Sequence, residues 1–157
     1  MTVKVTARRP RQPKVDKPWV EVTTAIEGSK LTEPESYFAL AVKNRYPALY
    51  ARMTRSNLPY EGSNYLSDFT IIEHEHPWYR GLVIEIQGGI YSRHKSGHSS
   101  PKGLLRDYAK VTRAQLNRWF VLQVAPDLDS LDQAIENIVD ITQQWDEDVI
   151  QCDVGLL

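Results

Sequence analysis

Gly81-Leu82-Val83-Ile84-Glu85-Ile86-Gln87-Gly88-Gly89 is the most informative segment for the fold of this chain. Its continuous apolar run predicts a strand over 81–87 that is buried on both faces. Glu85 and Gln87 are two residues apart, so their side chains leave the strand on the same side. A buried charge is costly unless something pairs with it. Because a metal ion is the obvious partner for Glu85, the segment indicates a metal site built on a sheet.

The composition of the chain is that of an ordinary soluble globular protein. Its 157 residues are 41% hydrophobic and 25% charged, which suits one domain with a sizeable core. No apolar run approaches the ~20 residues of a membrane span, so we expect no membrane partner. Cys152 is the only cysteine, which excludes an intramolecular disulfide and a zinc knuckle and favours a reducing, cytoplasmic setting.

The charge of the chain is unevenly distributed along the sequence. Residues 1–19 carry six Lys or Arg against one Asp, so the rest of the chain is acidic although the net charge is only -1. We therefore divide the chain into a basic, flexible N-terminal arm at 1–19 and a single domain at 20–157. Such an arm fits a tail that follows a nucleic-acid backbone, and a solvated terminus is the alternative. The candidate phosphate contacts of the arm are Arg8, Arg9, Arg11 and Lys14.

Capping boxes and apolar periodicity predict the element order helix, two strands, helix, strand, helix. Thr32-Glu33-Pro34-Glu35 opens the first helix, and Ser130-Leu131-Asp132-Gln133 opens the last. The last helix is expected to give way to a solvated acidic tail at 146–148. The remaining predictions are a first helix ending near Tyr46, a loop over 48–64, strands at 65–73, 81–87 and 119–124, a hairpin connection at 74–77, a loop over 92–102 and a helix ending near Asn117.

Several residues, taken in order, resemble the core of the PD-(D/E)xK nucleases, in which an Asp and an E-x-K, sometimes E-x-Q, bind metal at one edge of a sheet. The resemblance covers about residues 32–142. Residues 82–124 are similar to one branch, the small phage and bacterial endonucleases that include very-short-patch-repair-like and resolvase-like proteins. The series that carries the resemblance is Asp68, Glu85-Ile86-Gln87-Gly88-Gly89, Arg93-His94, Gly103, Asp107-Tyr108-Ala109-Lys110 and Trp119-Phe120-Val121-Leu122-Gln123-Val124.

The chain departs from the family pattern at three places. Gln87 stands where most members have the motif lysine, and Ser67 rather than Pro precedes Asp68. Asn117-Arg118 stands where the family favours a glycine before the tryptophan.

The resemblance implies an α/β fold with a restriction-endonuclease-like core, a central mixed sheet flanked by helices. It implies Mg²⁺-dependent hydrolysis of DNA, with Mn²⁺ as a substitute metal, by an endonuclease of phage or mobile-element type in a bacterial host cytoplasm. Branched, mismatched or site-specific DNA are all candidate substrates. A chain with one active site would nick DNA, or cut both strands as a homodimer.

The chemistry of phosphodiester hydrolysis assigns the metal ligands. A divalent cation supplies most of the charge neutralisation, and Mg²⁺ prefers oxygen ligands. Asp68 and Glu85 are the candidate carboxylates, and the backbone carbonyl of Ile86 is a candidate third oxygen. Gln87 could orient the attacking water or coordinate through its oxygen. For Asp68 and Glu85, structural ion pairs are the alternative.

Further catalytic candidates come from the helices and from the loop after the metal strand. Lys110 shares a helix face with Asp107 and Ala114; if that face looks toward the strand ends, Lys110 replaces the motif lysine, and otherwise it forms a surface pair with Asp107. Glu35 resembles the first-helix glutamate of such nucleases, with a purely capping role as the alternative. In the loop, His94 is a candidate acid or base, and Arg93 and Lys95 are candidate phosphate contacts.

Two other classes of function compete with the nuclease. The first is a nucleic-acid-binding module that keeps the fold without catalysis. The second is a small interaction or inhibitor protein in which Glu85 forms a buried ion pair. His74 and His76, which alternate with Glu73 and Glu75, are interpreted as a charged hairpin tip rather than a zinc site.

Overall fold

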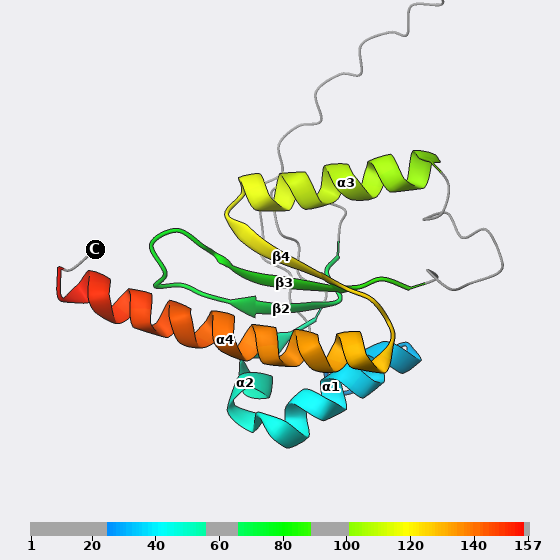
Figure 1. Cartoon of the computed structure of the whole chain (residues 1–157), viewed down its shortest axis with the longest axis horizontal. Helices are drawn as coiled ribbons and strands as arrows, with labels where there is room; N and C mark the ends of the chain where they lie inside the picture. Colours follow the sequence, from blue (N-terminus) through cyan, green and yellow to red (C-terminus); the bar gives the residue numbers. More distant parts are fainter. Residues whose placement is uncertain (1–24, 56–65, 89–100, 156–157) are drawn as a thin grey trace, which may run out of the picture.

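The computed structural model describes residues 25–55, 66–88 and 101–155 (Figure 1). Its elements are α1 (Glu33–Arg45), α2 (Pro47–Arg52), β1 (Met53–Thr54), β2 (Phe69–Ile72), β3 (Gly81–Ile86), α3 (Pro101–Leu116), β4 (Trp119–Val124) and α4 (Leu128–Asp153). The predicted arm at 1–19 lies outside the described residues. No helix in the described part of the chain is long and apolar enough to cross a membrane.

One mixed sheet of four strands forms the centre of the fold. Its order is β1-β2-β3-β4; β1 and β3 each pair antiparallel with β2, and β4 pairs parallel with β3. In the register of β2 and β3, Phe69 lies opposite Ile84, and Ile72 opposite Gly81. Parallel strands need a crossover, and α3 supplies it between β3 and β4. The predicted mixed α/β class is therefore confirmed.

Helices cover both faces of the sheet. Figure 1 shows α3 on one side and α4 with α1 on the other. On the α1 and α4 side, a single core cluster joins the sheet to both helices; it includes Phe38, Val42, Phe69, Ile71, Leu82, Ile84, Ile86, Leu131, Ile135 and Ile138. On the other side, Val83 packs with Ala114 of α3 and Trp119 of β4. The prediction that this strand is buried on both faces is confirmed, because Val83 and Ile84 are both fully buried.

Three parts of the predicted layout are wrong. The last helix does not open at Ser130: its N-cap is Asp127, whose carboxylate accepts the N–H of Ser130 at 2.9 Å. The stretch predicted as loop over 48–64 contains α2 and β1. β1 has only two residues and forms by pairing with β2, so it is too short for local periodicity to predict it. The expected solvated tail at 146–148 is part of α4, which continues to Asp153 because Trp145 packs into the core.

The β2–β3 connection also differs in part from its prediction. A connection between antiparallel strands is confirmed, and His74 lies on its exposed side. His76, however, is buried: its Nδ1 accepts the backbone N–H groups of Trp78 and Tyr79 at 3.2 and 3.1 Å. Its ring centroid lies 5.3 Å from that of Trp145. The interpretation of His76 as part of a charged tip is therefore wrong.

Helix α3 turns its small residues toward the sheet. Gly103 and Ala114 are its buried positions, whereas Leu105 and Leu116 are 68% and 74% exposed. Small side chains let the helix axis approach the sheet closely. The face that carries Asp107, Lys110 and Ala114 is consequently the one that faces the sheet. The replacement of the motif lysine by Lys110 requires this orientation of α3.

Candidate active site

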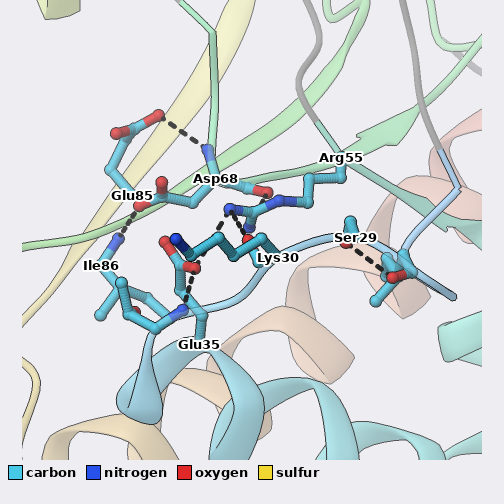
Figure 2. A network of polar contacts seen from close by, with 9 residues as sticks. Ser29, Lys30, Glu35, Arg55, Asp68, Glu85 and Ile86 are labelled. Atoms are coloured by element: carbon cyan, nitrogen blue, oxygen red, sulfur yellow. Dashed lines mark hydrogen bonds and ion pairs between the residues drawn. The ribbon is translucent and has the colours of Figure 1, made fainter.

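The candidate site lies where β2 begins and β3 ends. The strand register continues so that Asp68, just before β2, lies beside Glu85 of β3. The backbone N–H of Ile86 donates to Asp68 Oδ2 at 2.8 Å, and the N–H of Asp68 donates to Glu85 Oε1 at 3.3 Å. In Figure 2, Glu85 lies above Asp68 and Glu35 below it. The Asp68 carboxylate therefore lies beside that of Glu35 from α1, and the backbone N–H of Asp68 lies beside the carboxylate of Glu85 from β3.

Asp68 has an unusual electrostatic environment. Burial raises the pKa of its carboxyl from 3.8 to about 6, and the adjacent carboxylate of Glu35 acts in the same direction. The N–H of Ile86 and the charge of Arg55 act in the opposite direction on this pKa. Burial and a like charge both disfavour the ionised form. Such a raised pKa beside a second carboxylate is typical of functional sites.

Glu35 has two roles that the sequence presented as alternatives. It is the third residue of α1, and its Oε2 accepts the backbone N–H of Thr32 at 2.8 Å, so the predicted capping box is confirmed. The same Oε2 lies 3.1 Å from Nη2 of Arg55, and only 9% of the Glu35 side chain is exposed. The glutamate is therefore both a helix cap and a member of the acidic cluster.

Arg55 is the residue of the cluster that the sequence did not predict. It directly follows β1, in the stretch that was interpreted as loop. Its guanidinium contacts Glu35, the carbonyl of Lys30 at 3.1 Å and the carbonyl of Asp68 at 3.3 Å. No local pattern marks this arginine, because its partners lie 13 to 25 residues away along the chain.

Glu85 and Lys110 lie on the same side of the sheet. Side chains alternate along β3, so Glu85 shares the face of Val83, which packs against Ala114. Lys110 lies one helical turn, about 6 Å, from Ala114, and Glu85 lies about 7 Å along the strand from Val83. Because α3 runs opposite to β3 (Figure 1), Lys110 is displaced from Ala114 toward the end of the sheet at which Glu85 lies. Its Nζ is 3.8 Å from Asp107 Oδ1, so the pair with Asp107 also forms.

The other candidate residues divide into those at the site and those beyond the described residues. Gln87 directly follows β3 and its N–H donates to the carbonyl of Val124 at 2.8 Å. Ile86 contributes its N–H to Asp68, and the role of its carbonyl oxygen stays a prediction. Outside the described residues lie His94, Arg93, Lys95, Arg8, Arg9, Arg11 and Lys14.

The donor set suits a hard cation with few protein ligands. Within residues 25–55, 66–88 and 101–155, no three His, Cys, Asp or Glu side chains are grouped closely enough to hold a metal ion by themselves. Mg²⁺ commonly takes one or two carboxylates and completes its shell with waters and phosphate oxygens. Asp68 with its adjacent carboxylates meets this smaller requirement.

Comparisons with known proteins give no match: no family model, no curated protein and no solved structure is significantly similar to this chain.

Proposed function

We propose that this chain is a Mg²⁺-dependent DNA endonuclease with a PD-(D/E)xK-like core. The observation that supports it best is the placement of Asp68, whose carboxylate lies beside Glu35 of α1 and whose backbone N–H lies beside the Glu85 carboxylate at the end of β3. These carboxylates lie partly out of water at one edge of a mixed sheet. A divalent cation would relieve their mutual repulsion, which is the physical reason to assign the cluster to metal-dependent hydrolysis.

Asp68 and Glu85 would hold Mg²⁺, or Mn²⁺ in its place, with the Ile86 carbonyl as a further oxygen. When bound, the cation activates a water and neutralises charge on the scissile phosphate. The N–H of Ile86 donates to Asp68 Oδ2 and holds the carboxylate in one orientation, which would favour its binding of a cation. Gln87 can orient the attacking water but cannot supply a positive charge.

Lys110 would supply the cation that Gln87 lacks. It lies on the α3 side of the sheet, toward the end at which Glu85 lies, and a positive charge there would stabilise the charge that develops on the phosphate. The arm residues Arg8, Arg9, Arg11 and Lys14, together with Arg93 and Lys95, would contact the DNA backbone. His94 would act as acid or base at the same phosphate.

The biological setting that we propose is a phage or mobile-element enzyme that acts in the bacterial cytoplasm on branched, mismatched or site-specific DNA. One site per chain cuts one strand. A double-strand cut therefore requires a homodimer, and a nicking enzyme does not. Products from supercoiled plasmid distinguish the two, since nicking gives relaxed circles and paired cutting gives linear DNA.

The decisive experiment incubates the purified full chain with supercoiled plasmid and with a four-way junction, in Mg²⁺, Mn²⁺ or EDTA. Cleavage should require metal, should disappear in Asp68→Asn and should persist in the matched control Asp129→Asn, a carboxylate in the first turn of α4. Equal cleavage by the wild type and Asp68→Asn would contradict the assignment. Salt-sensitive DNA binding without cleavage in any metal would indicate instead a binding module on the same fold.

A further inference from the structure

Much of the apolar surface of α3 faces solvent. The buried positions of the helix are Gly103 and Ala114, and no other described helix or strand lies on its outer side (Figure 1). Single exposed leucines are common at protein surfaces, whereas a continuous apolar patch marks an interaction surface. The large apolar side chains of α3 are between 45% and 74% exposed; they are Leu104, Leu105, Tyr108 and Leu116.

These four side chains form one ridge along the helix. Each residue of an α-helix is rotated by about 100° from the residue before it, so residues three or four apart share a face. Leu104 and Leu105 therefore lie beside Tyr108. Leu116 lies about three turns beyond Leu105 on the same line. We call these four residues the α3 ridge, and it points away from the buried side of the helix.

Three cations line one side of the α3 ridge. Lys102, Arg106 and Arg113 are exposed, and their spacing of four and seven residues places them in one row along the helix. No ion pair between described residues involves any of them. By contrast, Lys43 and Arg45 of α1 each pair with a carboxylate. Within the described part of the chain, α3 therefore combines exposed apolar surface with a positive edge.

We propose that the α3 ridge docks a helix of a partner protein whose apolar stripe is flanked by carboxylates. Helices pack by fitting rows of side chains into grooves, and the α3 ridge is about 18 Å long, which suits an amphipathic helix of similar length. Carboxylates of the partner would lie against Lys102, Arg106 and Arg113 and complement their charge. The inference goes beyond the proposed nuclease and does not depend on its metal site.

Two other occupants fit the α3 ridge less well. A second copy of this chain would bring the same three cations to the same surface, and like charges that face each other weaken an interface. A lipid bilayer would accept the apolar side chains, but Thr112 and Gln115 are exposed among them. These two side chains would lose their hydrogen bonds to water in hydrocarbon, whereas a protein helix can supply polar partners.

The test measures the binding of two synthetic helical peptides to the full chain by fluorescence anisotropy. Both peptides carry the same leucine stripe over roughly 20 residues, and the flanks of the stripe are glutamates in one and lysines in the other. The glutamate-flanked peptide should bind, with an affinity that falls as salt is added. The lysine-flanked peptide should bind more weakly, on the order of tenfold. Equal affinities would overturn the proposed charge complementarity.

Uncharged substitutions test the apolar part of the α3 ridge. The double variant Leu105→Gln, Leu116→Gln should weaken binding of the glutamate-flanked peptide on the order of tenfold, because it removes two apolar anchors. Ile150→Gln is the matched control, since Ile150 is 63% exposed on α4, at the other side of the sheet. All three side chains are exposed, so Tm should change little. Wild-type affinity in the double variant would contradict the assignment of the ridge.

The row of cations is tested in the same way. The double variant Arg106→Gln, Arg113→Gln should weaken binding of the glutamate-flanked peptide and flatten its salt dependence. Lys43→Gln, Arg45→Gln removes the same charge from α1 and should change neither the affinity nor its salt dependence. An unchanged salt dependence in the α3 variant would mean that these cations do not meet the partner.

Other occupants would give other results. Sedimentation of the chain alone would show a dimer that Leu105→Gln, Leu116→Gln loses, if a second copy covers the α3 ridge. Vesicles of phosphatidylglycerol and phosphatidylcholine would bind the wild type but not this variant, if a lipid surface covers it. Either result, or no binding of the glutamate-flanked peptide at millimolar concentration, would overturn the proposal. Metal-dependent cleavage is measured separately, so the proposed function stands or fails independently.

Discussion

Replacing Asp68 with Asn should make the metal-free protein more stable at neutral pH. Burial and the neighbouring Glu35 carboxylate raise the pKa of Asp68 to about 6 in the folded chain, against an ordinary value of 3.8. The folded state therefore prefers the protonated form, and ionising Asp68 costs stability. Asn resembles that protonated form, because it is uncharged and keeps an oxygen that accepts the N–H of Ile86.

The direction and the size follow from linkage. Between about pH 4 and about pH 6 the folded state binds more protons than the unfolded state, so wild-type stability falls as pH rises and the cost is complete above this range. A shift of about 2 pKa units corresponds to about 3 kcal/mol. Because the amide and carboxylate differ in their hydrogen bonds, we expect a gain of about 2 kcal/mol for Asp68→Asn at about pH 7.5. In a chain of this size, that is about 4–8 °C in Tm.

The assay is urea denaturation in EDTA from about pH 4 to about pH 8, for the wild type and Asp68→Asn. The difference in unfolding free energy should be small at the acidic end and grow to its full value by about pH 7. Asp127→Asn is the control, because it makes the same charge change at a carboxyl whose pKa is shifted in the opposite direction. The N–H of Ser130 holds the pKa of Asp127 below its ordinary value. That variant should lose stability above this pKa rather than gain it.

The stabilities of the wild type and Asp68→Asn should also be compared with Mg²⁺ added. Mg²⁺ stabilises only the folded state that binds it, so the advantage of Asp68→Asn should shrink as Mg²⁺ is added. Lower stability of Asp68→Asn than of the wild type, at neutral pH and without metal, would refute the proposed cost of ionising Asp68. A difference that does not vary between acidic and neutral pH would refute it equally, since it could not arise from the titration of Asp68.

Three other predictions concern the cation, the arm and the sheet. Lys110→Met should slow cleavage on the order of 10²-fold and weaken DNA affinity much less. Lys102→Met, in the exposed first turn of α3, is the control and should cleave at the wild-type rate. Full activity of Lys110→Met would mean that Lys110 only pairs with Asp107. Deleting residues 1–17 should reduce the log–log salt slope of DNA binding by about 0.9 for each phosphate that the arm neutralises, and an unchanged slope would mean that the arm does not touch DNA. Gly81→Ala should cost more than ~2 kcal/mol in chemical denaturation, because φ is +153° and a Cβ would collide with a carbonyl of β2, whereas Gly88→Ala meets nothing within 4 Å and should be nearly neutral.

Local sequence patterns were sufficient to predict most of the regular elements. The capping box at Thr32 and the apolar run at 81–87 each depend on neighbouring residues, and both appear in the structure. The proximity of Asp68 and Glu85 also followed from the sequence, because a short connection between two strands makes them antiparallel neighbours. The mixed α/β class could also be predicted, because it depends on the order of helices and strands along the chain.

The residues that complete the site depend on long-range contacts. Arg55 joins the acidic cluster through β1, a two-residue strand that exists only because β2 lies beside it. His76 is buried because Trp145, far along the chain, packs against its ring. Apolar periodicity also points to the wrong face of α3, since Leu105 and Leu116 are exposed whereas Gly103 and Ala114 are the buried positions of the helix. Periodicity reports the local conformation of a segment, whereas burial and charge pairing depend on contacts between segments that the sequence separates by tens of residues.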